Sequence, residues 1–178
     1  MSLPHALLTS LVEKPSSGYE LARRFDKSIG YFWHATHQQI YRELARMEGQ
    51  GWVASSAVDG GRAGKREFVV LPAGRDELRR WAATASEPME LRDELMLRLR
   101  ADAALGPLGL AEEFERRLDL HRQKLQAYRA IESRDFSAPH LPREAQLRYL
   151  ILKAGIQFEE GRILWTQDAL ATLRAGGD

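Results

Sequence analysis

The chain has 178 residues, of which 44% are hydrophobic, and its formal net charge is +1 at pH 7. This length fits one medium domain or two small ones, and the apolar content excludes a disordered chain. The absence of cysteine excludes disulfides, thiolate metal sites and cysteine nucleophiles. Neither a signal peptide nor an apolar run of about 18 residues is visible, so we expect a cytoplasmic protein.

Two adjacent capping patterns organise the first part of the chain. Apolar residues at helical spacing predict a first helix over residues 3–13. Ser17 is followed three positions later by Glu20, a capping box that predicts a short helix from about residue 18 to residue 26. After a predicted loop, Thr36 and Gln39 repeat the pattern and predict a helix over residues 37–50. Its inward stripe consists of Ile40, Leu44 and Met47.

The periodicity then changes from helix to strand. Residues 52–56 and 66–71 read as two strands, and the segment 58–65 between them holds three glycines and two cations. These features predict a hairpin with an exposed basic tip. Pro72 opens a further helix to about residue 84. The inward residues of that helix are expected to be Leu78, Trp81 and Ala82.

Ser86-Glu87-Pro88 is the expected boundary between a first domain, residues 1–85, and a second, residues 86–178. The first carries 12 Lys and Arg against 9 Asp and Glu, and the second carries 14 against 16. A polyanionic partner would therefore favour the first domain.

The second domain reads as helices without a strand. A helix is expected over residues 91–101, and nearly heptad spacing from Leu110 to Tyr128 predicts a long one. After a loop over residues 136–142, a final long helix should reach about Leu173. Pairing of the two long helices would leave apolar surface uncovered, which favours a dimerisation domain over a monomeric bundle packed on the first domain.

The order of elements in the first domain is that of a winged helix-turn-helix. Its third helix would present its outer face to base edges in a major groove. Gln and Arg on that face suit paired hydrogen bonds to adenine and guanine. The start of the short helix could hold a phosphate, and the basic tip could follow the backbone. From these arguments the candidate DNA contacts are Ser17, Tyr19, His37, Gln38, Arg42, Arg62, Lys65 and Arg66. Each taken alone could equally be a solvated surface side chain.

Three segments resemble the PadR family of bacterial transcriptional regulators. They are SGYELARRFD (17–26), QQIYRELARMEGQGWV (38–53) and GKREFVVLPAGRDELRRW (64–81), and the likeness extends to LRDELMLRLRAD (91–102). The resemblance implies a homodimer that binds an inverted repeat, often as a repressor. It also implies that Gln39 and Tyr41 join Tyr19, Gln38 and Arg42 on the DNA face. The segment 28–37 departs from the family pattern through His34 and His37.

A small aromatic effector is a further expectation from the family. The candidate aromatic side chains are Phe32, Trp33, Phe158 and Trp165, for which a place in the core is the alternative. No cofactor or metal is expected, although His34 and His37 are spaced to share one. Catalytic motifs are absent, since the glycines of segment 58–65 precede a strand rather than a helix, so an enzyme is not expected. The remaining alternative is a winged-helix adaptor that binds only proteins.

Overall fold

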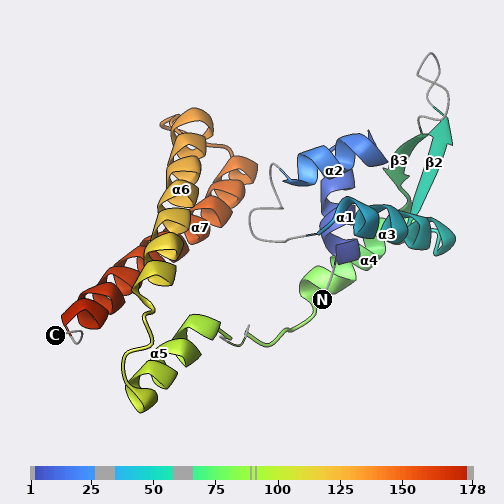
Figure 1. Ribbon diagram of the computed structural model, residues 1–178. Helices are drawn as coiled ribbons and strands as arrows, with labels where there is room; N and C mark the ends of the chain where they lie inside the picture. The colour runs from blue at the N-terminus through green and yellow to red at the C-terminus, as the bar shows by residue number, and fades with distance from the viewer. Residues whose placement is uncertain (1–2, 27–34, 58–65, 89, 91, 176–178) are drawn as a thin grey trace. The chain divides into compact units, whose positions relative to one another are not determined.

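The computed structural model describes residues 3–26, 35–57, 66–88, 90 and 92–175. The chain divides into two compact units, Met1–Pro88 and Met89–Asp178. Figure 1 shows a small sheet among the helices of the first unit, and long helices in the second. The predicted class, mainly α with a small β wing followed by long helices, is confirmed.

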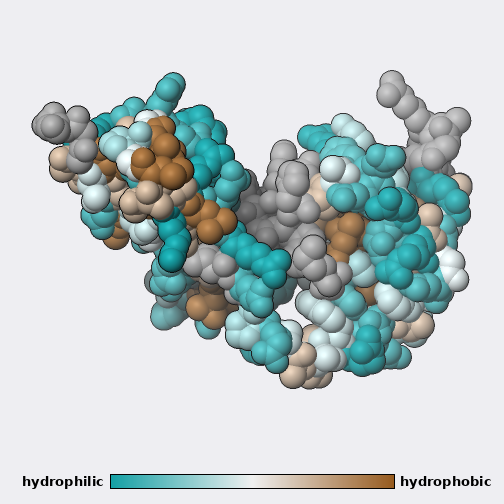
Figure 2. Space-filling view, turned by 60° about the horizontal axis from the view of Figure 1, so that its bottom comes forward, coloured by the Kyte–Doolittle hydropathy of each residue, from teal (hydrophilic) through white to brown (hydrophobic). Residues whose placement is uncertain are grey.

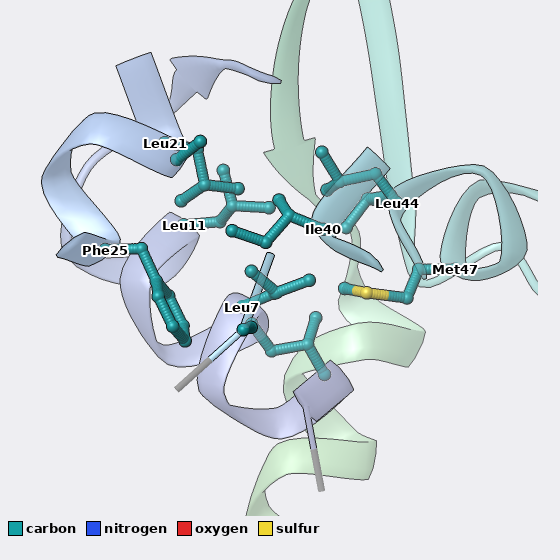
Figure 3. Packing of buried hydrophobic residues seen from close by; sticks show 11 residues of the cluster. Leu7, Leu11, Leu21, Phe25, Ile40, Leu44 and Met47 are labelled. Carbon is teal, nitrogen blue, oxygen red and sulfur yellow. The ribbon is translucent and has the colours of Figure 1, made fainter. Parts of the chain in front are cut away.

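In the described residues of the first unit, four helices surround one apolar core. They are α1 (Leu3–Glu13), α2 (Gly18–Asp26), α3 (His37–Gly49) and α4 (Pro72–Ala83), close to the predicted ranges. Figure 3 shows apolar side chains from α1, α2 and α3 converging on one another. The labelled members, all at most 1% exposed, are Leu7, Leu11, Leu21, Phe25, Ile40, Leu44 and Met47. The predicted inward stripe of α3 is therefore confirmed.

The sheet contains a strand that the sequence analysis did not predict. Strands β2 (Val53–Ala57) and β3 (Arg66–Val70) pair antiparallel, as expected for the wing. A two-residue strand, β1 (Ser16–Ser17), pairs antiparallel with the other edge of β3, which gives the order β1-β3-β2. Phe68 on β3 consequently lies opposite both Ser16 and Ser55. The start of α2 is thus hydrogen-bonded into the wing sheet.

Helix α4 corrects the expectation that Trp81 and Ala82 point into the core. It approaches the sheet through buried Gly74, where an added β-carbon would lie 2.3 Å from the carbonyl oxygen of Trp52. Its last turn extends beyond the core, so Ala82 is exposed and Trp81 retains 41% of its accessible surface. The Trp81 ring instead stacks on His5 of α1, with centroids 4.6 Å apart.

The second unit consists, within the described residues, of α5 (Glu94–Leu105), α6 (Ala111–Asp135) and α7 (Arg143–Ala175). Asp93 caps α5 by accepting a hydrogen bond from the Leu95 amide (2.9 Å), and Gly106 ends it with a φ of 91°. The helix therefore begins and ends later than the predicted range 91–101. Helices α6 and α7 lie side by side (Figure 1), joined by the predicted loop 136–142. The core of the second unit comprises Leu95 of α5, Phe114 and Leu118 of α6 and Leu170 of α7.

Helix α7 buries one face and exposes a second apolar row. The row consists of Leu147 (46%), Leu150 (58%), Ile151 (52%) and Phe158 (57%), whereas Leu164 (64%) is exposed on another side of the helix. Figure 2 shows exposed apolar surface, in brown, on the second unit. Pairing with α6 therefore leaves apolar surface uncovered, as the sequence predicts. Within the described residues, no helix is long and apolar enough to cross a membrane.

A buried carboxylate lies between the two long helices. Glu159 of α7 is 1% exposed, and its Oε2 lies 2.6 Å from Nδ1 of His121 on α6. Its other oxygen lies 3.1 Å from Nζ of Lys124. Burial of a carboxylate is unfavourable unless it is paired and hydrogen-bonded, and both conditions are met here. These contacts fix how α6 and α7 are aligned along their length.

Candidate nucleic-acid interface

The N-terminus of α3 is fixed by the predicted capping box. Thr36 has extended backbone angles (φ −77°, ψ 154°), and its hydroxyl accepts a hydrogen bond from the Gln39 amide at 3.2 Å. In return, the Thr36 amide donates to Oε1 of Gln39 at 2.8 Å. Such caps typically stabilise a helix by about 1 kcal/mol. The Gln39 side chain is therefore turned back onto its own helix end.

The outward face of α3 carries exposed polar and aromatic side chains. Gln38, Arg42 and Arg46 lie on it, opposite the buried stripe, and Tyr41 lies at its edge. His37 is in line with Leu44 and is exposed because it lies in the first turn of the helix. Arg46 is hydrogen-bonded to Glu43, which raises the pKa of its guanidinium, and it also lies over the Trp52 ring at 6.0 Å. Arg42 has no ion pair within the ranges that the structure describes, so its guanidinium remains available to another molecule.

The second capping box, at the start of α2, holds Ser17. The Ser17 hydroxyl donates to Oε2 of Glu20 at 2.9 Å and accepts from the Glu20 amide at 3.3 Å. The Ser17 amide donates to the same carboxylate at 3.2 Å. Ser17 is only 6% exposed, so its side chain serves the cap. Its predicted contact with a phosphate stays a prediction.

Two tyrosines occupy the surface where α2 meets α3. Tyr19 is 59% exposed and Tyr41 is 46% exposed. The guanidinium of Arg23 lies 5.7 Å from the centre of the Tyr19 ring. The ring of Tyr41 lies over Gly18, whose lack of a side chain makes room for it. The structure thus brings Tyr19, Tyr41 and Arg42 to the exposed faces of two adjoining helices.

Arg24 joins three segments at the base of this surface and was not singled out from the sequence. Its guanidinium donates to the carbonyl oxygens of Ser10 (2.5 Å) and Lys14 (2.8 Å) and to the Ser16 hydroxyl (2.7 Å). Partial burial lowers the pKa of Arg24 from its ordinary value. The end of α1, strand β1 and helix α2 are consequently held together. No local sequence pattern indicates this contact.

The base of the wing is linked to the end of α3 by a shared carboxylate. Oε1 of Glu48 accepts hydrogen bonds from the Ser55 amide (2.9 Å) and hydroxyl (2.5 Å), and it lies 3.5 Å from Nη2 of Arg66. The hydrogen bond from the Ser55 hydroxyl is the main reason why the pKa of Glu48 is lowered. Arg66 is exposed at the start of β3. The other predicted wing cations, Arg62 and Lys65, lie outside the described residues.

The proposed aromatic ligand residues are not gathered into one pocket by the described part of the chain. Phe32 and Trp33 lie outside the described residues. Phe158 is 57% exposed on α7. Trp165 is partly buried and packs against Phe114, with ring centroids 5.8 Å apart. Trp165 also lines a cavity that Phe158 does not reach.

No metal centre is formed by the residues that the structure describes: no three His, Cys, Asp or Glu side chains gather into a possible site. His37 lies exposed in the first turn of α3, whereas His34 falls outside the described ranges.

Two family models together match most of the chain. One, described as the transcriptional regulator PadR-like family, matches residues 7–80, and the other, virulence activator alpha C-term, matches residues 91–174. A probable transcriptional regulator of Mycobacterium tuberculosis is 43% identical, with 98% of each chain covered.

Two solved proteins share the fold over nearly their whole length. The virulence activator AphA of Vibrio cholerae has a TM-score of 0.83 and 30% identity, covering 98% of this chain and 99% of that one. PadR of Bacillus subtilis in complex with operator DNA has a TM-score of 0.80 and 25% identity, covering 97% and 99%. In the sequence comparison the same protein, a negative transcriptional regulator, is 26% identical over 96% of this chain and 97% of its own.

Proposed function

The chain belongs to the PadR-like family of transcriptional regulators, and on this premise we propose that it represses transcription as a homodimer bound to an inverted-repeat operator in double-stranded DNA. In this proposal, residues 1–85 form the DNA-binding domain and residues 86–178 form the dimerisation domain. A small aromatic effector releases the operator.

The outward face of α3 is the observation that carries the proposal. Gln38 and Arg42 are exposed there, on a helix fixed by a cap at one end and by a buried stripe beneath. A rigid helix with Gln and Arg directed outward suits base edges in the major groove, because both side chains can form paired hydrogen bonds. The Bacillus subtilis relative solved with operator DNA supports this assignment.

Contacts to the DNA backbone would surround this reading face. Tyr19 lies at the N-terminus of α2, where free amides favour a phosphate. Arg66, with Arg62 and Lys65 from the tip, would follow the backbone beside the wing and make binding salt-dependent. His37, Gln39 and Tyr41 complete the proposed surface, with Gln39 leaving its cap if it touches DNA.

The exposed row on α7 supports the homodimer. Leu147, Leu150, Ile151 and Phe158 share one face of that helix, and the second unit itself does not cover them. A second copy would remove them from water, a gain of about 25 cal/mol per Å². A twofold dimer would also present two α3 helices to successive major grooves, which is the geometry that an inverted repeat requires.

Selection of bound duplexes from a random pool tests the proposal. We expect an inverted repeat among the recovered sequences and reduced output from a reporter promoter that carries it. If no sequence is recovered, and if binding to random duplex DNA does not change with salt concentration, the alternative of a winged-helix adaptor that binds only proteins would be favoured. Increased reporter output would overturn repression, and this outcome has a precedent in the name of the Vibrio cholerae activator.

A further inference from the structure

A half-open cavity of about 670 Å³ lies within the second unit. Its walls come from the second half of α5, the segment that joins α5 to α6, the start of α6 and the last part of α7. The volume falls within the range of about 300–1,000 Å³ that is usual for small-molecule sites. All its lining residues belong to the second unit, whereas α3 belongs to the first.

The apolar walls of the cavity are fixed by the core behind them. Leu110, Trp165 and Leu173 line it, and all three pack against the buried cluster of the second unit. The indole of Trp165 is held by Phe114 and by the guanidinium of Arg162, which lies 4.4 Å from the ring centre. Arg162 is itself anchored to Asp93 at 2.6 Å. An apolar ligand would therefore contact side chains that are already held in place before it binds.

The charged groups that line the cavity are all acidic. They are Asp102 and Asp168, and neither forms an ion pair within the described ranges. Asp102 shapes the wall, because its Oδ1 accepts a hydrogen bond from the Leu108 amide at 2.7 Å. Asp168 is exposed on α7, and its carboxylate is unengaged among the described residues. An organic anion would be repelled here, and an organic cation would be attracted.

We propose that this cavity binds an aromatic cation, with the aromatic body against Trp165 and Leu173 and the cationic group beside Asp168. The two carboxylates favour a positively charged ligand, and the apolar walls favour an aromatic ring system. The proposal that the cation binds rests on the cavity alone and does not depend on the proposed function. Only the further step, that the bound cation acts as the effector which releases DNA, rests on the proposed function.

Calorimetric titration of the full chain with two probes of matched shape tests the binding. The probes are 1-naphthylmethylammonium and 1-naphthylacetate, which share the ring system and differ in charge. We expect the cation to bind at least about tenfold more tightly, since about 1.4 kcal/mol corresponds to that ratio. Asp168→Asn should weaken the cation about threefold to fivefold, in line with a partly exposed charge pair.

Two further variants keep the test decisive. Ala103→Trp adds bulk from an exposed wall position on α5 and should abolish binding without unfolding the chain, as judged by its melting temperature. Asp119→Asn, an exposed acid on α6 outside the cavity, should leave binding unchanged. Equal affinity for both probes, or binding that survives Ala103→Trp, would overturn the proposal.

A separate measurement addresses the effector role. If the cation binds but leaves DNA affinity unchanged, the cavity is a ligand site without control over the operator. If no probe binds and Ala103→Trp converts a dimer into a monomer, the cavity belongs to the dimer interface and the proposal fails. If the protein without any ligand does not bind DNA, that result counts instead against the proposed function.

Discussion

The ring of Tyr41 occupies the space that a side chain at Gly18 would need: an added β-carbon would lie 2.5 Å from Cε1 of Tyr41. This contact joins the first residue of α2 to the outward face of α3. The position of an exposed aromatic ring on the proposed DNA surface therefore depends on a residue in the neighbouring helix.

Gly18→Ala should displace the Tyr41 ring and lower operator affinity. The clash involves a side chain rather than backbone, and alanine favours helix over glycine, so the free energy of unfolding should change by about 1 kcal/mol or less. Fluorescence anisotropy with labelled operator, together with urea unfolding, measures both quantities. Equal operator affinity in Gly18→Ala and the parent protein would remove Tyr41 from the proposed interface.

Gln38→Ala and Arg42→Ala should each weaken operator binding and relax the sequence preference at one base position. Loss of a paired hydrogen bond to a base typically costs about 1–3 kcal/mol of discrimination. Competition between the operator and single-base variants measures this effect. Arg79→Ala, an exposed arginine on α4 paired with Asp76, is the matched control and should preserve affinity and preference.

Phe158→Asp should convert the dimer into a monomer. A charge placed in a covered apolar interface without a partner costs about 3 kcal/mol or more. Light scattering after size-exclusion chromatography gives the mass directly. Gln157→Asp introduces the same charge at an exposed polar position of the same helix and should remain dimeric. If both variants stay dimeric, the exposed row on α7 is not the interface.

Gly74→Ala should destabilise the first unit by about 1–3 kcal/mol, because its β-carbon would meet the Trp52 backbone rather than a movable side chain. Gly49→Ala, at the end of α3, meets nothing within 4 Å and should be neutral or stabilising. Denaturant unfolding of the two variants compares them. A similar stability for both would contradict the close packing of α4 on the chain before β2.

Glu77 should contribute to stability at neutral pH and cease to do so in acid. Hydrogen bonds from Arg80 and then from His5 lower its pKa from 4.5 to about 2. A carboxyl group with a depressed folded-state pKa stabilises above its unfolded pKa. The contribution is therefore complete above pH 4.5 and is lost as the pH falls toward about 2. The stability difference between the parent and Glu77→Gln should shrink over this range in unfolding experiments.

Local patterns predicted the elements of the first unit well, because their signals are short-range. Both capping boxes, at Ser17 and at Thr36, depend on residues three positions apart, and both form. The inward stripe of α3 follows from helical periodicity in the same way. The outward exposure of Gln38 and Arg42 then follows by default.

Features that depend on distant partners were missed. Strand β1 contains only two serines, so it carries no alternation, and it exists because β3 offers it an edge. Trp81 shares the spacing of inward residues, but the core ends before it. The apolar row of α7 illustrates the same limit, since periodicity identifies a face without telling whether the chain itself or a second copy covers it.

Strand β1 restricts relative movement within the first unit. Through β3 it ties the start of α2 to the wing, and Arg24 ties the same segment to α1. Glu48 at the end of α3 is in turn hydrogen-bonded to Ser55 of β2, so the separation of α3 from the wing is fixed as well. Consider a half-site in which one extra base pair separates the bases contacted by α3 from the phosphates contacted by the wing. The protein could make both sets of contacts only if the DNA were distorted. Its affinity for this half-site should therefore fall to that of a complex in which one set of contacts is missing.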